Sequence, residues 1–389
     1  MKKIPLNSLV FLIDVSPQEA EARFPANEIM SSDAFTTELL GPMVRPDLRG
    51  VVQAELERTV FLKLSLGQRV VVSMPDLRRD ARINMAREAQ NRGFTVIYLV
   101  DDLNIRRDMA RGDRVADVVD TNSSFEVVMP LPDENFFAEL KKRGFKGVTV
   151  VPDIHGTMNP LRDAISWARS RNNFLLFLGD LIDYGIDTLE VVDEVYQLVV
   201  RGEAEALEGN HEKKIFKHLA QVERTGVSHV RLSEGNKVTV SRMQALGKFD
   251  HDRWVTRFKA LVHMMRNHRV SDGFIFAHGA VKPEMWTITD NRLPTSLEEV
   301  SLYGEVDTSV NRSDGYPNRV YNWVDELTPN QIAVVGHDIR SDFEPLKHQG
   351  AKGGTAIFMD TGCGKGGHLS TLDIRFDGDV VKVENFNLH

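Results

Sequence analysis

Several apolar runs in the second part of the sequence end in residues that bind metals or transfer protons. Asp153 and His155 come directly after the run of residues 148–151. In an extended segment, side chains two residues apart point to the same side. We therefore expect this pair to bind one ion together. The later runs end in Asp180 with Asp183, Asn210 with His211, His278, and His337.

The types of these residues suit a metal centre. A carboxylate such as that of Asp180 can bridge two ions, and the amide oxygen of Asn210 is a ligand for hard cations. His211 follows that ligand directly and is a candidate general acid. Ordinary turns and hydrogen-bonded histidines would explain any one of these segments, but they explain the whole ordered set poorly.

The elements that must position these residues follow an α/β pattern. Short apolar runs of the strand type alternate with amphipathic helical stretches. Such proteins place their chemistry at the carboxyl ends of strands. The strands predicted in this series are residues 148–151, 174–178, 203–207, 273–277 and 331–335, and each runs into a polar or glycine turn.

An earlier series of elements indicates a separate N-terminal domain. Strands are predicted at residues 8–13, 69–73 and 95–99, with a helix at residues 80–91. Because domains run to about 100–200 residues, we expect one domain over residues 1–145 and a second over residues 146–389.

Taken together, the polar segments resemble the calcineurin-like metallophosphoesterases, in their phosphoprotein-phosphatase-like branch. Residues 359–367 are similar to the closing segment of that branch, and residues 303–323 look most like the phosphatase module of bacterial and phage polynucleotide kinase–phosphatases. The resemblance implies a β-sandwich flanked by helices. It also implies an enzyme that hydrolyses phosphate esters with two divalent metals, manganese being favoured over nickel, iron or zinc.

The resemblance further implies a role for each polar residue. The ligands would fall into two groups that share one carboxylate. A histidine held by a second carboxylate would protonate the leaving group. In these roles Asp153 and His155 bind the first metal, Asp180 bridges, Asn210, His278 and His337 complete the second metal, His211 protonates the leaving oxygen, and Asp183 orients His211.

One position departs from this branch, which usually carries Gly-Asp-x-x-Asp-Arg-Gly with a phosphate-binding arginine. Tyr184 stands in place of that arginine. A neutral phenol replaces a doubly donating cation, so we predict that diester hydrolysis is favoured relative to the arginine-bearing kin. Arg319 matches a second arginine of the family and is predicted to clamp phosphate. Two alternatives stay open: a solvated Arg319, and a phosphate-binding role for Lys213.

The N-terminal domain resembles a P-loop polynucleotide kinase whose phosphate loop has degenerated. Asp33 is similar to the catalytic aspartate of such kinases, and residues 106–114 are similar to their lid. A phosphate loop needs glycines and a lysine, but residues 14–23 contain neither. We predict a pseudokinase that does not use ATP and that serves as a docking surface or a nucleic-acid guide.

Composition excludes several other classes of protein. The 389-residue chain has a formal net charge of −8, so it lacks the overall basic character of duplex DNA-binding proteins. Cys363 is the single cysteine, which excludes an intramolecular disulfide. The apolar run at residues 9–12 is too short to span a membrane. We predict a cytoplasmic protein without a membrane partner, and the sequence leaves the oligomeric state open.

The favoured substrates are RNA ends that carry a 2′,3′-cyclic phosphate or a 2′- or 3′-phosphate. This preference rests on the domain pairing and on residues 303–323. A Ser/Thr phosphoprotein phosphatase and a dinucleoside tetraphosphatase are the enzyme alternatives, because the same metal site serves all of them. A nucleotide- or end-binding pseudo-enzyme is the alternative of another class. The complete ligand set argues against it, since unpaired buried carboxylates are costly without metal.

Overall fold

The chain divides into two compact units. The first comprises Met1–Pro130, Val200–Gly202 and Leu246–His263, and the second comprises Leu131–Val199, Glu203–Ala245 and Met264–His389. The expected domain boundary after residue 145 stays a prediction. Asp33 and residues 106–114 lie outside the described residues. The computed structural model describes residues 2–31, 49–73, 77–101, 117–290, 292–311, 317–377 and 380–389.

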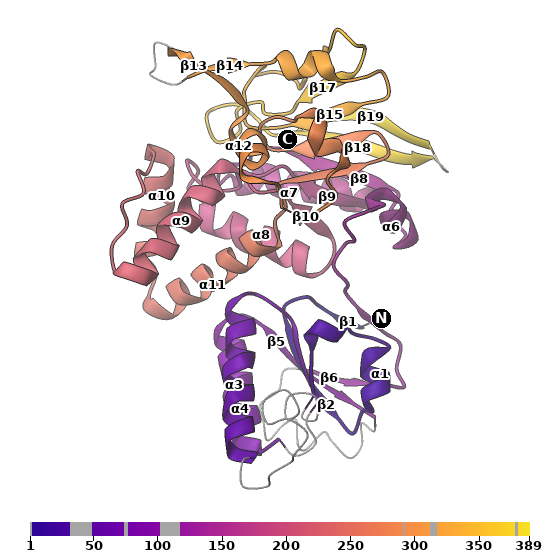
Figure 1. Ribbon diagram of the computed structural model, residues 1–389, viewed down its shortest axis with the longest axis vertical. Helices are drawn as coiled ribbons and strands as arrows, with labels where there is room; N and C mark the ends of the chain where they lie inside the picture. The colour runs from indigo at the N-terminus through magenta and orange to yellow at the C-terminus, as the bar shows by residue number, and fades with distance from the viewer. Residues whose placement is uncertain are drawn as a thin grey trace. The chain divides into compact units, whose positions relative to one another are not determined.

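The first unit contains a parallel five-stranded sheet. Along the central strand, Leu9 and Phe11 contact one apolar cluster and Val10 contacts another, as expected for a strand that is buried on both faces. Two helices, α3 (Arg49–Ser65) and α4 (Arg79–Asn91), pack side by side on one face (Figure 1). The sheet order is β3 (Ile29–Ser31), β4 (Val70–Ser73), β2 (Ser8–Ile13), β5 (Thr95–Val100) and β6 (Asp117–Asp120).

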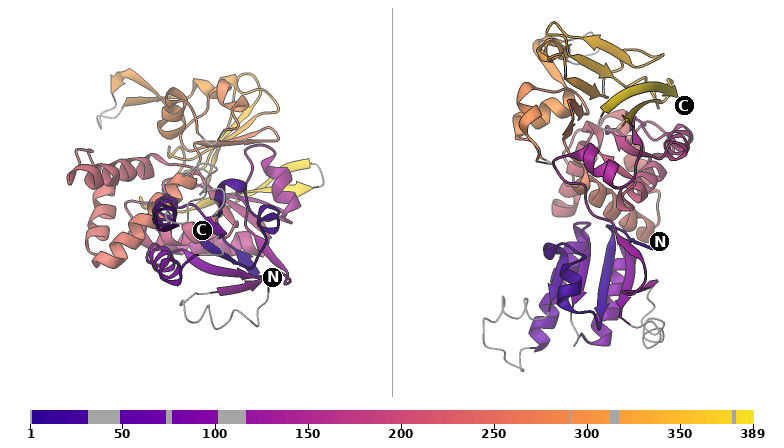
Figure 2. Two further views of the ribbon diagram at one scale, coloured as in Figure 1. Left: turned by 60° about the horizontal axis from the view of Figure 1, so that its bottom comes forward. Right: turned by 90° about the vertical axis from the view of Figure 1, so that its right-hand side faces the viewer.

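The second unit is a sandwich of two five-stranded sheets, which Figure 2 shows from two sides. One sheet has the order β10 (Ala204–Ala206), β9 (Asn173–Phe177), β8 (Gly147–Val151), β18 (Ser370–Asp377) and β19 (Val380–Leu388). The other has the order β11 (His268–Ser271), β12 (Phe274–Ala277), β15 (Ile332–Val335), β17 (Thr355–Phe358) and β16 (Leu346–Gln349).

Alternation along the strands builds the core between these sheets. Val148 and Val150 of β8 meet Phe274 and Phe276 of β12 in one cluster. The intervening Ile275 of β12 faces a second cluster on the outer side of its sheet, because successive side chains of a strand point to opposite faces. The predicted β-sandwich flanked by helices is therefore confirmed.

A helix connects β8 to β9, and another connects β9 to β10. β8, β9 and β10 run parallel, and so do β12, β15 and β17.

Among the described residues, no helix is both long and apolar enough to cross a membrane. The remaining elements are β1 (Lys2–Ile4), α1 (Pro17–Glu21), η1 (Ala26–Glu28), β7 (Phe125–Val127), α6 (Phe136–Lys142), α7 (Met158–Ser170), α8 (Thr188–Val200), α9 (Asn210–Thr225), α10 (Glu234–Gln244), α11 (Lys248–Met264), η3 (Pro283–Thr287), α12 (Thr295–Tyr303), β13 (Glu305–Asn311), β14 (Pro317–Val320) and η4 (Asn322–Glu326).

Candidate metal centre and active site

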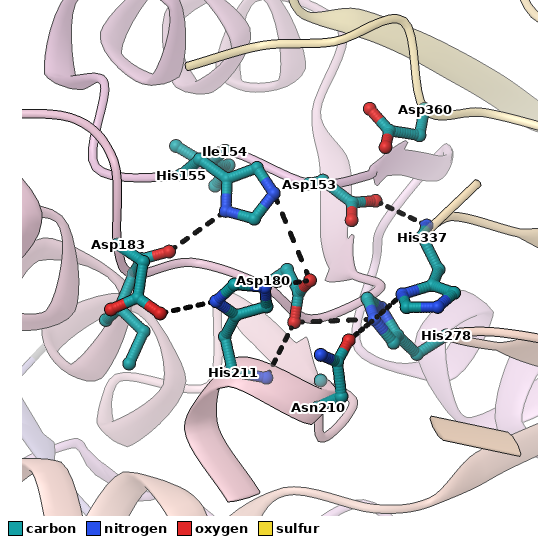
Figure 3. Close-up of polar contacts among 12 residues, drawn as sticks. Asp153, Ile154, His155, Asp180, Asp183, Asn210, His211, His278, His337 and Asp360 are labelled. Carbon is teal, nitrogen blue, oxygen red and sulfur yellow. Dashed lines mark hydrogen bonds and ion pairs between the residues drawn. The ribbon is translucent and has the colours of Figure 1, made fainter. Parts of the chain in front are cut away.

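The loops that follow the parallel strands of the second unit bring the predicted ligands together. Asp153 and His155 follow β8, and Asp180 follows β9. Figure 3 shows Asp180 at the centre, with His155 and His211 to one side and His278 to the other. The further residues come from the start of α9 after β10, which supplies Asn210 and His211, and from the ends of β12 and β15, which supply His278 and His337.

Asp180 belongs to two separate groups of possible ligand atoms. One group joins it to His155 and His211 and the other to His278 and His337, with the atoms of each group within 4.8 Å of one another. Its Oδ2 lies 4.0 Å from Nε2 of His155 and 3.6 Å from Nε2 of His211. Its Oδ1 lies 3.4 Å from Nε2 of His278. The two oxygens thus face different groups, which is the arrangement that a bridging carboxylate requires.

Backbone carbonyls orient two of the histidine rings. Nδ1–H of His155 donates to the Ile182 carbonyl at 3.0 Å, and Nδ1–H of His278 donates to the Leu178 carbonyl at 3.0 Å. In each ring the proton is therefore on Nδ1, and Nε2 keeps its lone pair for a metal. Burial lowers the pKa of His155 to about 3, so this ring is neutral, as a ligand must be.

Buried atoms without hydrogen-bond partners mark where a cation fits. Among the described residues, no partner is found for Oδ1 of Asp153, Nε2 of His155 or Oδ2 of Asp360, and all three residues are buried. Leaving such groups unpaired costs about 1–3 kcal/mol each. Oxygen and imidazole donors of this kind suit a divalent cation. Figure 3 shows Asp360, which the sequence did not single out, beside Asp153.

The electrostatics of the site favour a bound cation. Burial, followed by the neighbouring Asp360 carboxylate, raises the pKa of Asp153 well above its usual range. Burial alone would lower the pKa of His278, but the carboxylates of Asp180, Asp153 and Glu212 together outweigh burial and raise that pKa to about 9. The buried carboxylates thus favour positive charge at this point, in the form of a proton or of a metal ion. A bound cation would replace that proton.

The other predicted ligands lie at the second group. Oδ1 of Asn210 is 3.0 Å from Nε2 of His278, and Nδ1 of His337 is 3.1 Å from the same atom. Oδ2 of Asp153 accepts the backbone N–H of His337 at 2.8 Å, which ties the loops after β8 and β15 together. All six predicted metal ligands therefore lie in one cluster, while their individual roles stay predictions.

Left-handed backbone conformations concentrate in this cluster. The φ angles are +48° for His155, +50° for Asp180, +78° for Asp183, +58° for Tyr184 and +66° for His337. Non-glycine residues in this region cost of order 1–3 kcal/mol each and gather at functional sites. The tight loops that present the ligands are thus held in place by the surrounding structure.

His211 and Asp183 form the predicted pair. Nδ1–H of His211 donates to Oδ2 of Asp183, so Nε2 points toward Asp180. Burial alone would lower the pKa of His211, but Asp180 and Asp183 raise it overall. Two residues of α10 that the sequence did not indicate, Asn236 and Thr239, also donate to the buried Asp183 carboxylate.

Glu212 joins the loops after β9 and β10. Its carboxylate accepts the N–H groups of Asp180 and Leu181 at 2.9 Å, of Ile182 at 3.3 Å and of Gly209 at 3.2 Å. The sequence offered a signal for this residue, because a glutamate three residues after a helix cap commonly returns to the cap N–H. Glu212 thus holds the backbone of Asp180, the residue predicted to bridge two ions.

The residues predicted to bind substrate lie at the rim of the cluster. Nη2 of Arg319 is 2.6 Å from Nε2 of His337. The Tyr184 ring meets the rings of His155 and His211, with centroids 4.8 and 5.7 Å apart. Lys213, which the sequence left as an alternative phosphate ligand, is paired instead with Glu298 at 2.8 Å and Glu208 at 3.4 Å.

Comparison with known proteins agrees with this geometry. The family model "Calcineurin-like phosphoesterase" matches residues 147–338. A bis(5′-nucleosyl)-tetraphosphatase PrpE (asymmetrical) of Oceanobacillus iheyensis is 24% identical over 235 residues, which are 57% of this chain and 86% of the relative. The protein of the same name from Geobacillus sp. (strain WCH70) is 28% identical over 198 residues, which are 50% of this chain and 73% of the relative.

A metallophosphoesterase structure from Sphaerobacter thermophilus is 15% identical with a TM-score of 0.36, covering 63% of this chain and 88% of that one. The family match begins at β8 and ends just after His337, so it spans the loops that carry all six predicted ligands and His211. The second unit thus belongs to the calcineurin-like phosphoesterase family, whose members use divalent metals, and the chain is a hydrolase of phosphoester bonds.

Proposed function

We propose that this chain is a two-metal phosphohydrolase of the phosphoesterase family that cleaves a phosphoanhydride bond of dinucleoside polyphosphates, with water adding to one phosphorus and a nucleotide leaving. The observation that carries the two-metal part is the position of Asp180, whose two oxygens face different groups of ligand atoms. The substrate class is supported by the relatives named bis(5′-nucleosyl)-tetraphosphatases. A polyphosphate chain also carries the high negative charge that the cations at the rim of the site would attract.

The residues present fit two divalent cations. Asp153, His155 and Asp180 would hold the first, and Asp180, Asn210, His278 and His337 would hold the second. Such a pair of ions lowers the pKa of water and neutralises phosphate oxygens. We propose manganese, with nickel, iron and zinc as alternatives, since nitrogen and oxygen ligands bind all four metals.

The chain's own residues supply proton transfer and substrate positioning. His211 donates a proton from Nε2 to the leaving oxygen, because Asp183 holds its Nδ1–H and leaves Nε2 facing Asp180. The raised pKa of His211 favours the protonated ring that this step needs. Arg319, beside His337, would bind a non-reacting phosphate oxygen.

RNA ends, which the sequence favoured, stay a prediction. They rest on residues 303–323, of which residues 312–316 lie outside the described part of the chain, and on the kinase-like interpretation of the first unit. The first unit does contain a five-stranded sheet. Its residues 14–23, however, lack the glycines and the lysine that a phosphate-binding loop needs. The phosphoprotein-phosphatase alternative, the pseudokinase role and a cytoplasmic location likewise remain predictions.

The test is hydrolysis by full-length protein that has been stripped with chelator and reloaded with Mn²⁺. Diadenosine tetraphosphate is compared with RNA carrying a 2′,3′-cyclic phosphate, a phosphoserine peptide and bis-p-nitrophenyl phosphate. We expect no turnover without metal and the highest kcat/KM for the tetraphosphate. Undiminished activity of the stripped protein would overturn the two-metal assignment. A higher kcat/KM for the RNA end or the peptide would overturn the substrate class.

A further inference from the structure

A glycine-rich loop after β17 packs directly against a proposed metal ligand. In this loop, Gly362, Gly364 and Gly366 have φ angles of +83°, +76° and +95°. A Cβ on Gly364 would lie 2.5 Å from Cβ of His155, so only glycine fits there. The next residue in the sequence is Lys365. The packing of Gly364 thus holds the backbone of Lys365 close to the candidate metal ligands.

The loop is also anchored by contacts at and before Lys365. The N–H of Gly362 donates to Oδ1 of Asp360 at 2.9 Å, and the N–H of Lys365 donates to the Gly362 carbonyl at 2.9 Å. Sγ of Cys363 lies 2.9 Å from Oγ1 of Thr157, the residue that precedes α7. Lys365 therefore extends from an ordered turn and not from a free surface loop.

The ammonium group of Lys365 is placed over the ring of Tyr184. Its Nζ lies 4.9 Å from the ring centroid, within the range of a cation–π contact. The same ring contacts His155 and His211 edge-on or tilted. Through Tyr184, the positive charge is thus held next to one proposed metal ligand and to the proposed general acid.

Among the described residues, Lys365 differs from other cations near the site in forming no salt bridge, although its charge acts on the buried Asp360 carboxylate and opposes the rise in the pKa of that group. In the part of the chain that the structure describes, no ion pair to its exposed side chain is found. By contrast, Lys213 pairs with Glu298, and Lys282 pairs with Glu305. A cation that forms no salt bridge and lies beside the candidate metal ligands is available for an anionic ligand.

We propose that Lys365, seated on Tyr184, binds a phosphate oxygen of the substrate and gives the site its preference for polyphosphate. Lys365 lies on the side of His155 and His211, and Arg319 lies on the side of His337. A polyphosphate chain that crosses the cluster of candidate metal ligands would contact both Lys365 and Arg319. A singly charged diester would need only one of them.

This inference rests on the proposed function and revises one expectation from the sequence. Tyr184 was expected to weaken binding of highly charged phosphate, because it replaces a cation. With Lys365 on its ring, the tyrosine instead supports a cation that comes from another part of the chain. Tyr184 is then a positioning residue, and Lys365 is a substrate-binding residue.

The test compares Lys365→Met and Lys365→Arg with Lys217→Met, a control at an exposed lysine of α9. Calorimetry measures the Kd of tripolyphosphate for each Mn²⁺-loaded protein, with metal content and thermal midpoint recorded in parallel. Because a charge-assisted hydrogen bond is lost, we expect Lys365→Met to raise Kd about tenfold. Lys365→Arg should restore most of the affinity, and Lys217→Met should leave it unchanged.

Kinetics separate this inference from the proposed function. Lys365→Met should raise KM for diadenosine tetraphosphate more than KM for bis-p-nitrophenyl phosphate, with kcat less affected. An unchanged tripolyphosphate Kd, or an equal loss for both substrates, would overturn the role of Lys365. If wild-type protein hydrolysed neither diadenosine tetraphosphate nor bis-p-nitrophenyl phosphate while the tripolyphosphate Kd still depended on Lys365, the proposed function would fail and the binding role would stand.

Discussion

β2 and β8 are each the central strand of a five-stranded sheet, yet the loops that follow them satisfy their polar groups differently. After β2, Oγ of Ser16 accepts the N–H of Glu19 at 3.2 Å, and Arg23 pairs with Glu19 at 2.9 Å. After β8, Asp153 and His155 are buried, and each leaves one atom without a hydrogen-bond partner among the described residues.

Backbone strain does not separate these two loops. Asp14, directly after β2, has a φ of +59°, and His155, after β8, has a φ of +48°. Both loops thus contain the left-handed conformation that often accompanies function. What distinguishes the β8 loop is its set of buried ligand atoms with no internal partner, whose cost a bound ion would offset. A central strand end gives a place for chemistry, and the side chains decide whether chemistry occurs there.

The largest effect is expected from Asp180→Asn. The substitution keeps the size of the side chain but removes the charge that faces both ligand groups. We expect both ions to be lost and kcat/KM to fall by about 100-fold or more. This loss exceeds the one expected when a residue that only hydrogen-bonds to a metal ligand is replaced. Metal content and kcat/KM are measured together, with Asp163→Asn on the exposed side of α7 as the control. Two tightly held ions and normal turnover in Asp180→Asn would remove the proposed bridge.

The next effect concerns His211→Ala. The proposed proton donor is lost while the ligand groups around His278 are kept, so metal content should persist. For substrates with poor leaving groups, kcat should fall roughly 100-fold or more. Esters of p-nitrophenol need less protonation and should lose far less. Equal losses for good and poor leaving groups would show that His211 is not the general acid.

A smaller effect is expected from Asn236→Ala and Thr239→Val, which remove donors to Asp183. Both act through Asp183 and His211, so kcat for poor leaving groups should fall about tenfold. In a His211→Ala background, neither substitution should lower kcat further, because its target is already absent. Full additivity with His211→Ala would mean that these residues act on stability and not on the proton donor.

Much of the framework that holds the site could be predicted from local sequence. The strand predicted at residues 8–13 is β2 (Ser8–Ile13), and the helix predicted at residues 80–91 is α4 (Arg79–Asn91). Apolar runs rich in β-branched residues and bounded by turn residues carry a strong local signal. The same signal located the loops after β8, β9, β10, β12 and β15, and with them the predicted ligands.

The residues that the sequence missed are linked to the site only through long-range contacts. Asn236 and Thr239 lie on α10, far along the chain from Asp183, and nothing in their own segment indicates that carboxylate. Lys365 and Asp360 belong to a segment that was noticed as a family-like ending, but their roles depend on Tyr184 and Asp153 in space. Periodicity reports which face of an element is buried, and it does not report which distant residue meets that face.

The smallest effect tests the other side of the comparison, with Ser16→Ala in the first unit. Loss of the hydroxyl that caps α1 should destabilise that segment by about 1 kcal/mol, because the N–H of Glu19 loses its acceptor. Amide hydrogen exchange of residues 19–24 should become faster, since local opening would cost less free energy. Ser16→Asp should restore protection, because a carboxylate also caps a helix. Phosphoester hydrolysis should not change in either variant, since the polar groups after β2 serve structure. A fall in kcat/KM that Ser16→Asp does not rescue would contradict that division between the two loops and would give the β2 loop a part in the reaction.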